Sequence, residues 1–186
     1  LSSTLVKHIY LLITDEIDID IPQCSTLLID RLSSSDTVRK IASKSDTPFS
    51  LIYTKYTTLQ LGQFALERFY SIASSTESAL VYSDYYQIAE GLSTLHPLID
   101  YQEGSLRDDF DFGSVLFYNA EYLKMASAVT TTTYHFAGLY NLRLRISQHG
   151  RITHIDEFLY SEVEDDTRKG GGKQFDYVDP KNRAVQ

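Results

Sequence analysis

Length, composition and charge already exclude several classes of protein. The chain has 186 residues, 42% hydrophobic and 23% charged, a composition typical of one soluble globular domain rather than of a disordered chain. It carries 17 basic and 25 acidic side chains, a formal net charge of −8, which disfavours binding to nucleic acid phosphates. The single cysteine, Cys24, excludes an internal disulfide framework and a cysteine-based zinc cluster, and fits a reducing, cytoplasmic location.

The apolar runs and the two chain ends suggest how the sequence is organised. No run of about 18 apolar residues occurs, so no transmembrane segment is predicted. The start, Leu1 to Thr4, has neither a methionine nor a signal-peptide pattern, so we expect a piece of a longer protein. We predict one α/β domain over 1–166, and a flexible Gly/Lys loop with a C-terminal linker over 167–186.

The first half alternates apolar strand-like runs with segments of helical spacing. The segment Ser33–Lys44 opens with capping residues and then places Val38, Ile41 and Ala42 on one side, which predicts a helix. Apolar residues that recur three and four positions apart predict a second helix over Leu59–Ser74. The predicted strands are Leu5–Thr14, Ser25–Asp30, Pro48–Thr54 and Ala79–Ser83.

The second half is less regular. A hairpin is predicted over Tyr85–Ile99, with Glu90 and Gly91 at its turn, followed by a polar loop over Tyr101–Phe112. The remaining predicted elements are a strand over Ser114–Tyr118, helices over Ala120–Val129 and Leu139–Gln148, and a strand over Arg151–Tyr160. The alternation of the first half predicts an α/β fold, with a mostly parallel central sheet and helices on both faces.

Two carboxylates follow predicted strands directly. Asp15 comes after the first strand and Asp84 after the fourth. Because ligands in open α/β sheets bind outside the carboxyl ends of the strands, both are candidate ligand-binding residues at one cleft. The alternative is that each carboxylate caps a turn or a helix N-terminus.

The densest acidic segment within the predicted domain supplies a candidate metal site. Asp109 and Asp111 alternate with Phe110 and Phe112, so an extended chain places the carboxylates on one face and the rings on the other. Carboxylate oxygens are suitable ligands for Mg²⁺ or Mn²⁺. The alternative is a solvated loop anchored by two buried rings.

Other catalytic patterns lack support. No pair of the five histidines has the spacing of a metal site, and we predict no functional role for any of them. No GxSxG motif is present, and the basic glycine-rich run at 168–173 lacks P-loop spacing.

Five strings, in their order and spacing, resemble family 2 glycosyltransferases of the nucleotide-diphospho-sugar transferase fold. They are ALVYSDYYQIAEG (79–91), HPLIDY (96–101), SVLFYNAEYLKMA (114–126), GLYNLRLRIS (138–147) and ITHIDEFLY (152–160). Through YSDYY (82–86), IDYQEGSLRDDFDFGSVL (99–116) and QFDYVDPKNR (174–183), the chain is also similar to the amino-terminal, degenerate domain of longer glycosyltransferases from Bacteroidetes. The resemblance implies that fold, incomplete at its N-terminus, and a nucleotide sugar donor, a glycan acceptor and an adjacent glycosyltransferase domain as partners.

The sequence also departs from that family's pattern. The stretch 53–58 stands where the family carries its metal-binding DxD motif and contains no carboxylate, and 138–141 stands where the family's base lies. The resemblance carries over only to Asp15 and Asp84, as nucleotide-contacting acids. Lys55, in place of the missing acids, is a candidate phosphate contact as a point charge.

Two functions that depend on this fold therefore remain open for the chain. One is sugar-nucleotide-dependent glycosyl transfer in the synthesis of polysaccharide or cell-surface glycan. The other is a catalytically degenerate domain of the same fold, which binds a ligand or serves as a scaffold, because the DxD motif and the base are missing. The sequence identifies no catalytic residue. A plain interaction module, suggested by the 14 tyrosines, is the third reading.

Overall fold

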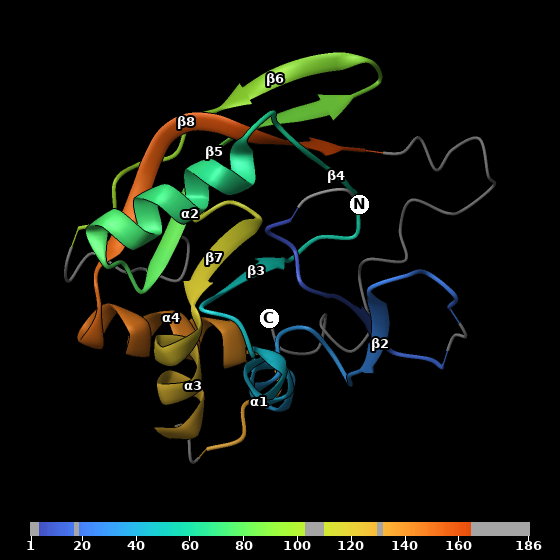
Figure 1. Ribbon diagram of the computed structural model, residues 1–186, viewed down its shortest axis with the longest axis vertical. Helices are drawn as coiled ribbons and strands as arrows, with labels where there is room; N and C mark the ends of the chain where they lie inside the picture. Colours follow the sequence, from blue (N-terminus) through green and yellow to red (C-terminus); the bar gives the residue numbers. More distant parts are fainter. Residues whose placement is uncertain (1–3, 17–18, 103–109, 130–131, 165–186) are drawn as a thin grey trace, which may run out of the picture.

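The computed structural model describes residues 4–16, 19–102, 110–129 and 132–164 (Figure 1). In these residues the chain forms four helices and eight strands. In chain order they are β1 (Ile9–Ile13), β2 (Cys24–Leu28), α1 (Ser35–Lys44), β3 (Phe49–Tyr53), β4 (Thr58–Leu61), α2 (Ala65–Thr76), β5 (Leu80–Ala89), β6 (Leu92–His96), β7 (Val115–Asn119), α3 (Ala120–Val129), α4 (Gly138–His149) and β8 (Ile152–Val163). The predicted linker over 167–186 lies outside the described residues. No helix in the described part is long and apolar enough to span a membrane.

The strands form two separate sheets. β1 and β2 pair in parallel as a two-stranded sheet, whereas the six-stranded sheet has the order β3-β7-β5-β8-β4, with β6 added to β5. In the larger sheet only β5 and β8 run in parallel, and every other pairing is antiparallel. The two edge strands of this order, β3 and β4, are joined by residues 54–57 alone, so the sheet curls towards a barrel (Figure 1).

The predicted fold class is therefore wrong. The sheet is mixed and nearly closed into a barrel, not a mostly parallel central sheet with helices on both faces. The physical reason lies in the connections: β3 continues through a four-residue link into β4 rather than through a crossover helix, and β5 turns back at once into β6. A parallel neighbour needs a long crossover, and these short links cannot provide one.

The helix predicted over Leu59–Ser74 begins six residues too early. Residues 58–61 form β4, and α2 starts only at Ala65. Gly62 donates its backbone N–H to the carbonyl of Leu159 at 2.8 Å, and a β-carbon at Gly62 would lie 3.0 Å from that oxygen. This close approach anchors the segment to β8, and the apolar spacing of Leu59 and Leu61 suits a strand as well as a helix.

The other local predictions agree better with the structure. The side chain of Ser34 accepts a hydrogen bond from the backbone N–H of Thr37 at 3.1 Å and so caps α1, as its sequence predicts. Glu90 and Gly91 have φ of 53° and 77°, and two positive values are what the primed hairpin turns favour. The hairpin's first strand, however, is continuous with the strand predicted over Ala79–Ser83, and together they form the ten-residue strand β5.

Two apolar clusters pack on either side of β5. α2 buries Ala65, Phe69 and Ala73 against a cluster that includes Val81 and Val115. The second cluster joins α1, α3 and α4 to Leu80, Tyr82, Leu116 and Tyr118. Because alternate residues of a strand point to opposite faces, β5 contributes to both clusters and holds the core together.

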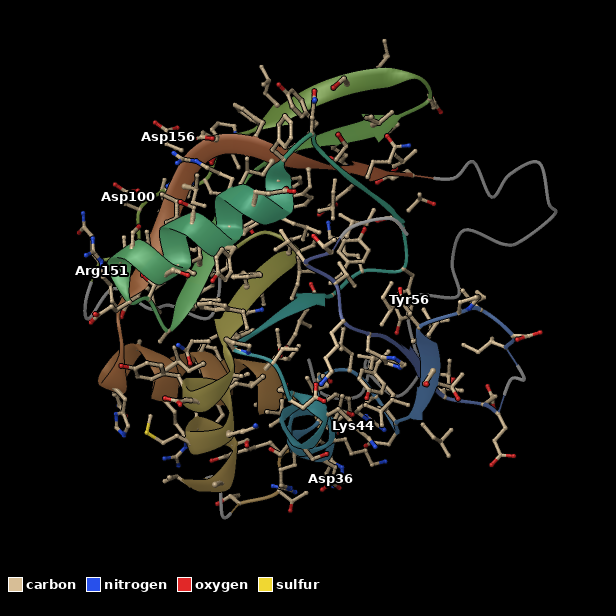
Figure 2. The ribbon with its side chains drawn as sticks, viewed as in Figure 1. Asp36, Lys44, Tyr56, Asp100, Arg151 and Asp156 are labelled. Carbon is tan, nitrogen blue, oxygen red and sulfur yellow. The ribbon has the colours of Figure 1, made fainter. Side chains whose placement is uncertain are left out.

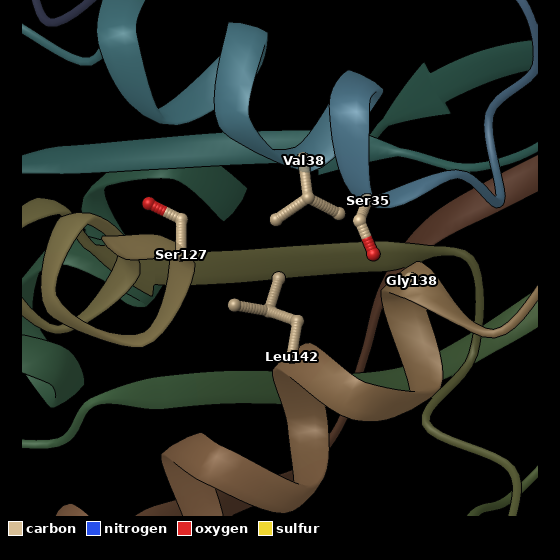
Figure 3. A pocket seen from close by; sticks show the side chains of 5 residues that line it. All are labelled: Ser35, Val38, Ser127, Gly138 and Leu142. Carbon is tan, nitrogen blue, oxygen red and sulfur yellow. The ribbon is translucent and has the colours of Figure 1, made fainter. Parts of the chain in front are cut away.

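The three helices α1, α3 and α4 meet closely at one point. Figure 3 shows Ser35 and Val38 of α1, Ser127 of α3, and Gly138 and Leu142 of α4 around a narrow space that leaves no room for a water molecule. The backbone N–H of Gly138 donates to the carbonyl of Ser33 at 2.7 Å. Only a glycine allows α4 to begin this close to the start of α1.

Candidate functional site

A buried carboxylate lies in the middle of the larger sheet. Asp84 is 1% exposed and sits on β5 where the pairing with β8 shifts register on both of its sides. Its Oδ1 accepts hydrogen bonds from the backbone N–H of Leu98 at 2.7 Å and from His154 Nε2 at 2.8 Å. Burying a charge is costly unless it is paired and hydrogen-bonded, and these two donors meet that requirement.

His154 connects this carboxylate to a second one near the surface. Its Nδ1 lies 2.8 Å from Oδ1 of Asp100, whose side chain is 83% exposed, whereas the His154 side chain is only 5% exposed. The imidazole ring of His154 thus bridges the two carboxylates, with one nitrogen facing each of them. We call these three residues the Asp–His–Asp network.

Tyr82 fixes the position of the outer part of the network. Its hydroxyl donates to the carbonyl of Ile99 at 2.6 Å, and its ring stacks on His154 with centroids 4.9 Å apart and planes at 19°. Burial raises the pKa of Tyr82 above its usual value, so the hydroxyl stays a donor. The segment that carries Asp100 is thus attached to the sheet by side chains from both β5 and β8.

The two carboxylates predicted to share a cleft do not lie at a common strand end. Asp15 is exposed and follows β1 of the small sheet, where Oγ1 of Thr14 donates to its Oδ2 at 3.2 Å. Asp84 lies inside β5 of the other sheet, not after a strand end. The structure therefore brings Asp84 together with His154 and Asp100, and not with Asp15.

Lys55 lies in the link between β3 and β4 and is paired with a carboxylate. Its Nζ is 2.6 Å from Oε2 of Glu162, a residue of β8 that is 1% exposed. The positive charge predicted to contact a phosphate is thus already opposed by a buried negative charge. That arrangement makes Lys55 a weaker phosphate ligand than the sequence suggests.

The predicted metal pair is described only in part. Asp109 lies outside the described residues. Asp111 is exposed, and its Oδ1 accepts the backbone N–H of Gly113 at 2.7 Å, as a carboxylate in a local turn does. Among the described residues, no three histidine, cysteine, aspartate or glutamate side chains group so that they could hold a metal ion. The pair of Asp109 and Asp111 therefore stays a prediction.

Sequence reasoning missed two of the three members of the network. His154 was assigned no role because it has no metal-type spacing, and Asp100 was one acid among many in the segment after the hairpin. A usable signal was present, however. Asp84, Asp100 and His154 are each followed directly by an apolar or aromatic residue, and polar residues in such segments need partners when buried.

The stability of this protein should fall steeply at alkaline pH because of a second buried tyrosine. Tyr160 is 1% exposed and its oxygen accepts the backbone N–H of Ser114 at 2.9 Å. Burial raises the pKa of Tyr160 to about 12, against about 10 in an unfolded chain. The folded state keeps a proton that the unfolded state releases, so the stabilisation is complete below pH 10 and is lost as the pH rises through about 12.

We expect this residue alone to remove on the order of 2 kcal/mol of the free energy of unfolding between pH 10 and 12. Urea unfolding at pH 9, 10, 11 and 12 measures the effect. Tyr160→Phe should flatten this pH dependence, whereas Tyr56→Phe, at a side chain that is 88% exposed, should not. An equal dependence in Tyr160→Phe and the unmodified chain would contradict the assignment.

An open depression lies away from the network, between two of the helices. It has a volume of about 310 Å³ between α1 and α3 and is lined by Arg39, Ala42, Ser43, Lys124, Ser127 and Ala128. Comparison with known proteins adds no family to these observations. No protein-family model matches the chain, and no curated protein matches it either.

Proposed function

We propose that this chain is a glycosyltransferase-like domain that acts on a nucleotide-activated sugar in the synthesis of polysaccharide or cell-surface glycan. Support comes from the strings that carry the family resemblance. Three of them, 79–91, 96–101 and 152–160, each contribute one residue to the Asp–His–Asp network. The proposal rests on these residues and their contacts, and not on the sheet, whose topology differs from the one the resemblance implies.

The chemistry that the network supports is proton transfer at the exposed carboxylate. Glycosyl transfer requires a base that takes the proton of the acceptor hydroxyl. Asp100 offers an exposed carboxylate whose position is set by His154, and His154 is in turn held by buried Asp84. The single observation that carries this role is the line of two 2.8 Å contacts from a buried acid through the imidazole to a surface acid.

A second function is favoured by another aspect of the same geometry. The network joins the segment after β6 to both β5 and β8, so its hydrogen bonds also act as an internal cross-link. A catalytically degenerate ligand-binding or scaffold domain would need this cross-link only for its stability. The two functions predict different results when the carboxylate of Asp100 is removed. Turnover falls if Asp100 is the base, and turnover is not affected if the network only stabilises the fold.

Turnover of a panel of uridine and guanosine diphosphate sugars, with and without Mn²⁺, tests the proposal. We expect release of nucleoside diphosphate when a glycan acceptor is present, and a loss of about 100-fold in kcat in Asp100→Asn, within the range for a general base. Asp156→Asn is the matched control, because Asp156 is an exposed acid of β8 outside the network (Figure 2).

The other outcomes separate the two functions. Binding of a donor without turnover in the unmodified chain would favour the degenerate domain. Neither binding nor turnover with any donor would reject the proposal. Equal activity of Asp100→Asn and Asp156→Asn would keep glycosyl transfer and remove Asp100 as its base.

A further inference from the structure

A second polar group is buried on β8, between β5 and β4, and is only half satisfied. Glu162 is 1% exposed, and its Oε2 lies 2.6 Å from Nζ of Lys55. Its other oxygen, Oε1, is buried and has no hydrogen-bond partner among the described residues. A buried carboxylate oxygen without a donor is rare in proteins, and none of the described residues supplies one here.

The surroundings of Glu162 supply further polar atoms. Nζ of Lys55 lies 5.9 Å from the ring centroid of Tyr85, and that ring is stacked between His96 and Tyr160. Burial raises the pKa of Tyr85, and the negative charges of Asp111 and Glu162 raise it further, so its hydroxyl remains protonated. The group therefore combines a carboxylate acceptor, an ammonium donor and a phenol.

Lys55 separates this group from solvent. The Lys55 side chain is 46% exposed, whereas the side chain of its partner Glu162 is 2% exposed. A lysine has three N–H donors on a flexible four-carbon stem, so its ammonium can turn towards a ligand and still stay near the carboxylate. Access of a ligand to Glu162 therefore requires this side chain to turn aside.

We propose that Lys55 and Glu162 form a binding site for two neighbouring hydroxyl groups of a neutral sugar or polyol. One hydroxyl donates to Oε1 of Glu162, and the oxygen of the next accepts from Nζ of Lys55. A hydroxyl group is both donor and acceptor, so a vicinal diol complements this pair with no change in charge.

The charge of the site favours a neutral ligand over a phosphate. The carboxylate of Glu162 lies 2.6 Å from the ammonium and opposes its charge, and a phosphate on Lys55 would approach that buried negative charge closely. The inference is independent of the proposed function, since the site shares no residue with the Asp–His–Asp network and needs no nucleotide donor.

Amide NMR spectra of the isotope-labelled chain, titrated with neutral monosaccharides, glycerol and inorganic phosphate in separate experiments, test the site. We expect a saccharide to shift the amide signals of residues 53–57, 85 and 160–162. Glu162→Gln and Lys55→Met should each weaken that binding at least tenfold. Glu164→Gln is the matched control, because this exposed residue directly after β8 accepts a hydrogen bond from Gln87 instead.

Three results would overturn the inference. They are the absence of saccharide shifts at these residues in the unmodified chain, shifts produced by phosphate alone, and saccharide shifts confined to residues 98–100 and 154. The titration of the unmodified chain decides the matter even if a variant fails to fold. Loss of turnover in Asp100→Asn with unchanged saccharide shifts near Glu162 would separate this site from the proposed base.

Discussion

Asp84→Asn should lower the free energy of unfolding by about 3 kcal/mol, because it breaks a buried charged pair while leaving its shape almost unchanged. Asp84 is 1% exposed and accepts two hydrogen bonds through one oxygen, from Leu98 and His154. An asparagine keeps one carbonyl acceptor but carries no charge, so the buried ring of His154 loses its charged inner partner. Urea unfolding at pH 7, followed by circular dichroism, measures the loss.

A control and a double-mutant cycle give this prediction its specificity. Asp156→Asn, at an exposed position of β8, should change the free energy of unfolding by less than about 0.5 kcal/mol. In the cycle, Asp84→Asn combined with His154→Gln should cost clearly less than the sum of the two single changes, since both remove the same contact. Additive effects would mean that the two side chains do not interact as the structure shows.

Gly138→Ala should destabilise the protein by about 3 kcal/mol through a clash between two helix N-termini. A β-carbon at Gly138 would lie 2.4 Å from the carbonyl carbon of Ser34 and 2.5 Å from the backbone nitrogen of Ser35. These are backbone atoms, which cannot rotate away as a side chain does, so α4 must move away from α1. That movement also stretches the 2.7 Å hydrogen bond from Gly138 to Ser33.

Thermal unfolding measures this effect. For a chain of this length, about 3 kcal/mol corresponds to a fall in Tm of roughly 6–12 °C. Gln148→Ala is the control within the same helix, because Gln148 is exposed and alanine favours the helix. A fall of less than about 2 °C for Gly138→Ala would show that the helices α1 and α4 do not approach as closely as described.

Local features were predictable wherever the decisive contacts lie within a few residues of each other. The cap of α1 by Ser34 and the turn at Glu90 and Gly91 depend on hydrogen bonds and backbone angles between near neighbours, and the structure confirms both. The helices α3 and α4 were found within about one residue of their ends for the same reason. Asp84 was singled out as a carboxylate after a strand end, but it lies inside β5, and its partners were not predicted.

The order and direction of the strands could not be read from the sequence. Residues 59–61 carry a spacing that suits helix and strand alike, and the choice was made by pairing with β8, about 100 residues later. The same applies to the site: Lys55 and Glu162 are 107 residues apart, and His154 and Asp84 are 70 apart. The sequence by itself determined which segments bury apolar side chains and how they begin, turn and end, because these depend on local periodicity and backbone angles. Only the tertiary structure decided the mixed, nearly closed sheet and the Asp–His–Asp network, because both arise from pairings between distant strands.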